Sequence, residues 1–459
     1  MTDRGPVVRQ TAPVSPRRAL AGRLLAPALV AVALLAGACT PGEGPPAPAV
    51  GADARASTSA TPTVDEAAAR EGALTDLLRR RSAAVLGRDR DAFAATLDDP
   101  RSGFGLRQLE LFDALGRLPL RTFAYGVPEP APALGDERAA QVGPGAWVAK
   151  VTGRYALAGY DRGEREFETH LTVVRRAGGW RLADDSDGGS QPQLWDLPDL
   201  TVVRSRTTLV VGSGPASRLR EYLRLGDEAV SRVKQVWTRP WSGRLVLVVP
   251  RTSAQMAELV GQDATGVEQV AAVTDGALGA DGRAGADRVV VNPAALARLQ
   301  PDGRRVVVTH EATHVAVRWG TTAPVPLWLS EGMADFVGYR GLGLSRTRVA
   351  APLLDQVRAG GAPRRLPQEG DFDPGRSTIA PHYNAAWLAV SLIADQHGTA
   401  GLVRFYAAAA TAGSASASGE AAAADADERT AAAFRDVLGT SEAAFTRQWS
   451  AYVGRLARS

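Results

Sequence analysis

The sequence predicts an α+β protein with two folded domains behind a leader and a linker. Apolar residues recur at steps of three and four over 66–98, which indicates helices. From about residue 118 the chain carries short apolar runs separated by Gly, Pro and Asp, which indicate strands. Helical spacing returns after about residue 200 and dominates to the end. A chain of 459 residues with 45% hydrophobic content is long enough for two such cores.

Residues 1–38 have the three parts of an export signal peptide. An Arg-rich start precedes the apolar run 24–35, and three small residues lead to Cys39. That run is too short to span a membrane comfortably. The segment LLAGAC resembles the bacterial lipoprotein signal, which implies lipidation of Cys39, export, and a lipid anchor on the outer face of the bacterial plasma membrane. Because Ala36 stands where Leu is usual, a plain cleaved signal remains the alternative.

Charge and cysteine content exclude two classes of protein. Five arginines and one aspartate give the leader a charge of +4, which equals the formal net charge of the whole chain. The remainder is neutral, so no nucleic-acid partner is expected. Cys39 is the only cysteine, so the exported chain can form no internal disulfide. Residues 39–65 are rich in Pro, Ala, Ser and Thr and are predicted to be a disordered linker.

Residues 66–198 are predicted to form the first domain, with two helices before four strands. This layout resembles the NTF2-like cone fold, an α+β fold that can hold a pocket or serve as a spacer or interaction module. The acidic turn 184–189 can attract calcium, but it lacks the full twelve-residue loop pattern, which favours a solvated turn. The strands are expected at 122–127, 146–157, 165–177 and 179–185.

Residues 199–459 are predicted to form the second, mainly helical domain. Strands are expected at 244–250 and 288–293. The low-complexity stretch 407–428 is expected to be a mobile insertion. Helices are expected at 217–237, 254–261 and 430–456.

The segment 304–320 carries the motif HExxH on a predicted helix, for which Asp302 is the expected N-cap. His310 and His314 are four residues apart, so both imidazoles leave one face of the helix, about 6 Å apart at the backbone. That spacing suits two ligands of one tetrahedral zinc, and Glu311 lies beside them without being a ligand. Two histidines on a purely structural helix remain the alternative.

A second segment, 326–339, contributes two more carboxylates. Pro326 opens a predicted helix on which Glu331 and Asp335 share one face. The spacing from His314 leaves room for the first helix to end, turn and run back, so the chain can bring an oxygen ligand to the same metal. Three protein ligands leave a fourth position for water, as a catalytic zinc requires.

HExxH followed by WLxEGxAD resembles the gluzincin group of zinc peptidases, which includes thermolysin and the aminopeptidases. Within that group it is closest to a family of bacterial MA-clan peptidase-like proteins, and the resemblance covers about 215–455. It implies a mainly helical catalytic domain with a small antiparallel sheet. It also implies a zinc ion held by His310, His314 and Glu331, with Asp335 hydrogen bonded to the outer ring nitrogen of His310.

The same resemblance implies the catalytic roles. Glu311 would be the base that takes a proton from a zinc-activated water and returns it to the leaving amine. Tyr383 would stabilise the oxyanion, with His382 as the alternative. From its place in the chain, the strand 288–293 is a candidate for pairing with an extended substrate.

These features predict a zinc-dependent peptidase that hydrolyses a peptide or protein substrate on the outer side of the membrane. No strand resembles the GxMEN element by which aminopeptidases recognise an amino terminus, which favours an endopeptidase. The alternative is an inactive, vestigial peptidase-like lipoprotein that acts as a binding or scaffold module. Retention of both histidines and both glutamates favours activity.

Overall fold

Within the described residues the chain combines helices with one antiparallel and one mixed sheet, which confirms the predicted α+β class. The predicted signal peptide, Cys39 and most of the predicted linker lie outside those residues. In the part of the chain that is described, no helix is both long and apolar enough to cross a membrane. The computed structural model describes residues 64–268, 270–279, 281–373, 378–411 and 420–459.

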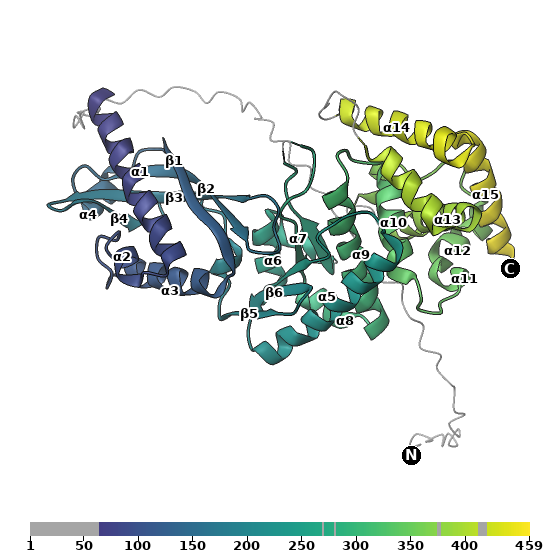
Figure 1. The fold of residues 1–459 in the computed structure, drawn as a ribbon, viewed down its shortest axis with the longest axis horizontal. Coiled ribbons are helices and arrows are strands. Elements are labelled where there is room, and N and C mark those ends of the chain that lie inside the picture. The colour runs from purple at the N-terminus through teal and green to yellow at the C-terminus, as the bar shows by residue number, and fades with distance from the viewer. Residues whose placement is uncertain (1–63, 269, 280, 374–377, 412–419) are drawn as a thin grey trace, which may run out of the picture.

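The first domain is built on an antiparallel sheet in the order β1-β2-β3-β4. The helix α1 crosses this sheet and packs on β1 (Figure 1). Its periodic leucines Leu74, Leu77 and Leu78 are buried, and all four predicted strands are confirmed. The structure adds α3 and α4, which the sequence pattern does not predict. The elements are α1 (Val64–Gly87), α2 (Arg90–Ala94), α3 (Gly103–Arg117), β1 (Leu120–Pro130), α4 (Asp136–Val142), β2 (Trp147–Leu157), β3 (Arg165–Arg176) and β4 (Gly179–Asp184).

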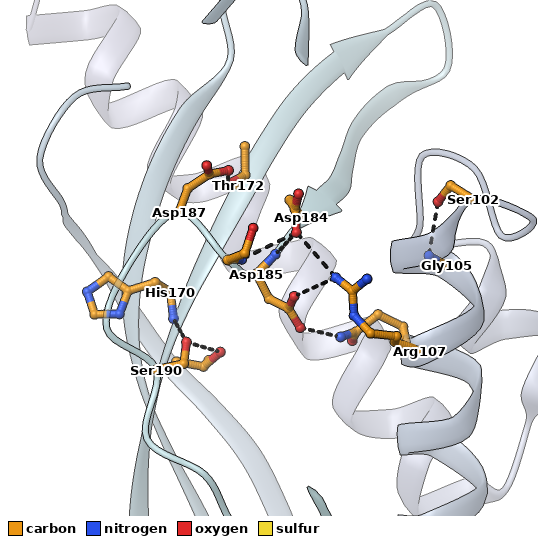
Figure 2. A network of polar contacts seen from close by, with 12 residues as sticks. Ser102, Gly105, Arg107, His170, Thr172, Asp184, Asp185, Asp187 and Ser190 are labelled. Carbon is orange, nitrogen blue, oxygen red and sulfur yellow. Dashed lines mark hydrogen bonds and ion pairs between the residues drawn. The ribbon is translucent and has the colours of Figure 1, made fainter. Parts of the chain in front are cut away.

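The helix α3 begins at a side-chain cap among glycines. The Ser102 hydroxyl accepts a hydrogen bond from Gly105 N at 3.0 Å (Figure 2). A Cβ at Gly105 would collide with the backbone of Asp99 and Pro100, so the close approach requires glycine there. Glycine is a poor helix former, which explains why the pattern does not predict this helix.

The acidic turn after β4 is held by arginines. Asp187 accepts hydrogen bonds from Arg138 Nε at 2.7 Å and from the Thr172 hydroxyl at 2.5 Å. Asp185 lies 3.3 Å from Arg107 (Figure 2). The hydrogen bonds from Arg138 lower the pKa of Asp187 below its usual range. Because the carboxylates already have donors, the structure supports a structural turn over a calcium site.

The sheet of the second domain is mixed, so the predicted small antiparallel sheet is wrong. Its order is β5-β6-β7-β9-β8, and the central pairs β6–β7 and β7–β9 are parallel. The crossover helix α5 between β6 and β7 permits parallel pairing. The central strands are buried along their length, as parallel strands usually are. The elements are β5 (Leu200–Arg204), β6 (Thr208–Ser213), α5 (Ala216–Val236), β7 (Leu245–Val249), α6 (Ser253–Val260), α7 (Ala264–Val267), β8 (Ala272–Asp275), β9 (Arg288–Val291) and α8 (Pro293–Arg298).

The strand order also bears on the prediction that the strand 288–293 pairs with an extended substrate. The segment 288–293 begins with β9, which pairs with β7 on one side and with β8 on the other. A substrate backbone therefore cannot add to it, and that prediction is wrong. The outer strand at this end of the sheet is β8, which the sequence pattern does not predict.

Helices make up the rest of the second domain (Figure 1). The helix α10 packs on α9 and along α13. Gly332 of α10 allows this approach, because a Cβ there would lie 2.5 Å from the Ala386 carbonyl oxygen. The elements are α9 (Pro301–Gly320), α10 (Leu327–Tyr339), α11 (Arg346–Val349), α12 (Ala351–Gly360), α13 (Ala380–Ala409), α14 (Glu420–Leu438) and α15 (Glu442–Arg458), with 3-10 turns η1 (Leu194–Asp196) and η2 (Glu369–Phe372).

Two predictions for these helices are wrong. Gln300 is the N-cap of α9, whereas Asp302 lies in the first turn, 3.0 Å from Arg305. The stretch 407–428 is not one insertion, because its ends belong to α13 and α14. Alanine is the strongest helix former, so Ala-rich composition favours helix there. Residues 412–419 lie outside the described residues.

Candidate metal centre

The helix α9 carries three ionisable side chains into the interior of the second domain. His310 and Glu311 are 0% exposed and His314 is 1% exposed. Around them the helix is apolar, with Val306 to Val308 and Val315 to Val317 buried. Buried ionisable groups need partners to offset their loss of hydration, so the neighbouring elements must supply them.

The helix α10 brings Glu331 to the two histidines. The ring nitrogens His310 Nε2 and His314 Nε2 lie 3.1 Å apart. Glu331 Oε2 lies 3.2 Å from His310 Nε2, and Glu331 Oε1 lies 3.6 Å from His314 Nε2. In the described part of the chain, these three residues form the one cluster of His, Cys, Asp or Glu side chains that could hold a metal ion.

The three ligand atoms fit a single tetrahedral ion. Two atoms that are each about 2.1 Å from such an ion lie about 3.4 Å apart, close to the three observed separations. Neither carboxylate oxygen of Glu331 has a hydrogen-bond partner among the described residues. A buried carboxylate without donors is strongly destabilising unless a cation compensates it. The donor set therefore fits a divalent metal.

Asp335 contacts His310, as the gluzincin resemblance implies. His310 Nδ1 lies 2.9 Å from Asp335 Oδ1, and His310 Nε2 lies 3.2 Å from Glu331 Oε2. With a metal bound, Nδ1 would donate to Asp335 and leave the Nε2 lone pair for the ion. Burial lowers the pKa of His310, but Asp335 and Glu331 outweigh it and raise that pKa well above its usual value. Burial raises the pKa of Glu331, and the histidines outweigh it and lower that pKa to about 2.

Glu311 lies beside the three candidate ligands and is held by a residue that sequence reasoning missed. Its Oε2 atom accepts a hydrogen bond from the Thr274 hydroxyl of β8 at 2.7 Å. Its Oε1 atom has no hydrogen-bond partner within the described ranges. Burial raises the pKa of Glu311, and the two histidines partly oppose this. The short strand AVTD gave no sequence signal that Thr274 would face the motif.

His314 also has a neighbour that the sequence analysis missed. The Ser330 hydroxyl lies 3.5 Å from His314 Nδ1. Burial raises the pKa of the Tyr406 phenol of α13 well above its usual value, and the nearby Ser330 partly opposes this. Ser330 precedes the ligand Glu331 within the second motif, so its place in the motif is a usable signal. Nothing in the sequence pattern singles out Tyr406.

The oxyanion candidates lie in the first turn of α13. Tyr383 is 5% exposed, and its ring packs edge-on against Phe372 with ring centroids 5.1 Å apart. His382 is half-buried; the hydrogen bond from Arg365 mainly lowers the pKa of Asp371, and His382 adds a smaller contribution. Tyr383 therefore stays a prediction for the oxyanion, with His382 as the alternative.

Comparisons with known proteins add no relative. No protein-family model matches the chain, and no curated protein is similar to it. The resemblance to gluzincins therefore rests on the motif residues. The geometry of the centre by itself supports a buried metal site with two imidazoles and one carboxylate.

Proposed function

We propose that this chain is an exported zinc-dependent peptidase of the gluzincin type, with an NTF2-like first domain and a lipid anchor at Cys39. The observation that carries the proposal is the convergence of His310, His314 and Glu331 with Glu311 beside them and outside the ligand set. The leader sequence supports export and the anchor. An endopeptidase acting outside the membrane on peptides or proteins fits these features.

The donor set favours zinc among divalent metals. Two imidazoles and a carboxylate suit zinc, and no cysteine lies in this domain. When bound, zinc supplies Lewis acidity that polarises a carbonyl group and makes water more acidic. Three protein ligands are the number found in catalytic rather than closed structural zinc sites.

The protein side chains would carry the proton transfers. Glu311 accepts a proton from the attacking water and returns it to the leaving amine nitrogen. Its raised pKa brings this carboxylate closer to the range that suits a general base near neutral pH. Asp335 fixes the tautomer of His310, and Tyr383 is the proposed donor to the oxyanion.

The outer strand β8 is the proposed partner of an extended substrate backbone. It lies at the end of the sheet and carries Thr274, which contacts Glu311. A peptide that adds to this edge would run past the base. This assignment replaces the segment 288–293.

One observation favours a second function, a vestigial peptidase domain that serves as a binding or scaffold module. None of the side chains of His310, Glu311, His314 and Glu331 is more than 1% exposed. Such burial is expected of a structural metal site, whereas a hydrolase must admit water and a peptide. Retention of Glu311, which a structural site does not need, favours the first function.

Zinc content and cleavage of a peptide library distinguish the two functions. In the full-length chain we expect one zinc and cleavage in the wild type, and one zinc without cleavage in Glu311→Gln. Glu331→Ala should lose both. Glu221→Gln, a matched change at an exposed glutamate of α5, should behave as wild type. One zinc with no cleavage by any form supports the scaffold, and full zinc in Glu331→Ala removes Glu331 from the ligand set.

A further inference from the structure

The turn between β2 and β3 of the first domain lies against the segment that joins β8 to β9 in the second. Arg162 N and Gly163 N both donate to the Gly285 carbonyl oxygen, at 2.8 and 3.2 Å. The Arg162 side chain donates to the Ala284 carbonyl oxygen at 2.8 Å. A Cβ at Gly285 would meet Gly163 at 3.0 Å, so the two backbones touch at two glycines. The first domain is thus seated directly on the β8–β9 hairpin.

Two ion pairs stabilise this contact: the first domain supplies the acidic partner of one and the basic partner of the other. Asp275 of β8 and Arg288 of β9 are cross-strand partners at the end of their ladder. Arg288 donates to both carboxylate oxygens of Asp161 at 2.7 Å, with both side chains at most 2% exposed. Arg165 pairs with the Asp275 carboxylate and also donates to the Asp275 carbonyl oxygen at 3.2 Å. The first domain therefore holds both members of one cross-strand pair.

Asp275, which the first domain contacts, is next in sequence to Thr274, which contacts Glu311 of the candidate metal centre. Side chains alternate along a strand, so Asp275 and Thr274 point to opposite faces of β8. Asp275 is bound by the first domain, while the Thr274 hydroxyl donates to Glu311 Oε2 at 2.7 Å and contacts the Glu311 carbonyl oxygen at 3.2 Å. A slip of β8 by one residue would turn Thr274 away from Glu311.

A purely structural interface is the competing explanation. Buried ion pairs are weak evidence for stability, because desolvation offsets their attraction. They do fix register when the pairing is reciprocal, and here each pair holds one strand of a short ladder. Because β8 is only four residues long, its own ladder with β9 constrains it weakly.

We propose that the first domain is a positioning element of the catalytic centre. Arg165 and Asp161 hold the β8–β9 ladder in register, and Thr274 thereby holds the Glu311 carboxylate in place for proton transfer. Thr274 is a positioning residue in this scheme. The catalytic part of this inference rests on the proposed peptidase function.

Hydrogen–deuterium exchange and steady-state kinetics of the full-length chain test the proposal. In Arg165→Gln we expect β8 amides of the metal-free protein to exchange about tenfold faster, because the clamp is lost. We expect kcat to fall about tenfold, with KM and zinc content within about twofold of wild type. The reversed pair, Arg165→Asp with Asp275→Arg, should restore much of both. Arg154→Gln is the matched control, because Arg154 pairs with Glu166 within the same hairpin and leaves the second domain untouched.

Substitutions of Thr274 test the last link. Thr274→Val keeps the shape but loses the hydroxyl, and kcat should fall about tenfold to a hundredfold with zinc content unchanged. Thr274→Ser should return kcat to within about threefold of wild type. A structural role alone would not follow the hydroxyl in this way.

The outcomes separate the inference from the proposed function. Unchanged β8 exchange in Arg165→Gln overturns the clamp, whatever the activity. Faster exchange with wild-type kcat, or equal kcat in Thr274→Val and Thr274→Ser, overturns the positioning role. If the wild type neither binds zinc nor cleaves peptides, the peptidase proposal fails, and β8 exchange in the Arg165 variants alone decides the clamp.

Discussion

The acidic turn of the first domain and the buried cluster of the second both bring carboxylates together, but with opposite partners. In the turn, Asp187 and Asp185 face arginines, and Asp187 also accepts from a hydroxyl. In the cluster, Glu331 faces two imidazole nitrogens, and neither of its oxygens has a hydrogen bond among the residues described. The carboxylates of the turn are already matched by positive charge, whereas the cluster could hold a cation.

The difference shows how a carboxylate cluster can be assigned from its partners. Arginine supplies a permanent charge and several donors, so an arginine-matched carboxylate has no remaining need for an ion. Neutral histidine supplies a lone pair when its other nitrogen donates, and His310 Nδ1 lies 2.9 Å from Asp335 Oδ1, where it can donate. Carboxylates that converge on such lone pairs are arranged to share a metal.

The largest expected effect is selective stabilisation of the second domain by zinc. At a free concentration of 1,000 times Kd, zinc should raise the free energy of unfolding by about 4 kcal/mol. Calcium should change it by less than about 0.5 kcal/mol, because the acidic turn already has its donors. Urea unfolding with and without each ion measures both quantities.

Two variants show where each ion acts. Glu331→Gln should abolish the response to zinc, whereas Asp187→Asn should keep it. A calcium response that Asp187→Asn removes would contradict the assignment of the turn as structural. An undiminished zinc response in Glu331→Gln would place the metal elsewhere.

Removal of the Asp335 carboxylate, which contacts His310, should have the next largest effect, a loss of zinc affinity. Asp335→Asn should lower zinc affinity about tenfold to a hundredfold, because the imidazole loses the carboxylate that fixes its tautomer and raises its basicity. Competition with a chromophoric chelator measures the affinity. Asp302→Asn, at a partly exposed aspartate in the first turn of α9, should leave it unchanged. Equal affinities in both variants would reduce Asp335 to a packing residue.

The sequence predicted the residues of the centre that share a helix, but not those that tertiary packing brings to it. The two histidines and Glu311 of HExxH lie on one helix, and Glu331 and Asp335 lie on the next. The periodicity within each helix was therefore enough to find all five residues. Thr274 contacts Glu311 from a four-residue strand, too short for a periodic pattern. Tyr406 comes near Ser330 only because α13 packs on α10. Contacts of that kind depend on tertiary packing and leave no local pattern.

The prediction of an antiparallel sheet in the second domain is an error that the sequence could have prevented. The runs of β6, β7 and β9 are apolar without alternation, which indicates strands buried on both faces and therefore parallel pairing. The small antiparallel sheet came from the gluzincin resemblance, which carries no information about these strands. By contrast, all four strands of the first domain were found, because Gly, Pro and Asp turns separate them, although β1 is longer at both ends than predicted.

The number of protons released when zinc binds is a further test of the histidine cluster, with a smaller expected effect. Burial lowers the pKa of His310, but Asp335 and Glu331 raise it overall, which favours the protonated imidazole in the metal-free protein, whereas zinc needs the neutral form. Binding at pH 7 should release about one proton per zinc, and affinity should rise about tenfold per pH unit below that pKa. Calorimetry in buffers of different ionisation enthalpy measures the release. Binding without proton release would show that His310 is already neutral.

The smallest expected effect belongs to the acidic turn. Asp187→Asn should lower the free energy of unfolding by about 1 kcal/mol at pH 7, since the pair with Arg138 is partly screened by solvent. Folding lowers the pKa of Asp187, so its contribution is present above the ordinary value of about 4 and is lost as the pH falls through the lowered value. Urea unfolding at pH 7 and near pH 2 should therefore show the variant and the wild type converging in acid. A variant that keeps its full deficit in acid would mean that the charge of Asp187 does not stabilise the turn, and that its packing against Thr172 does.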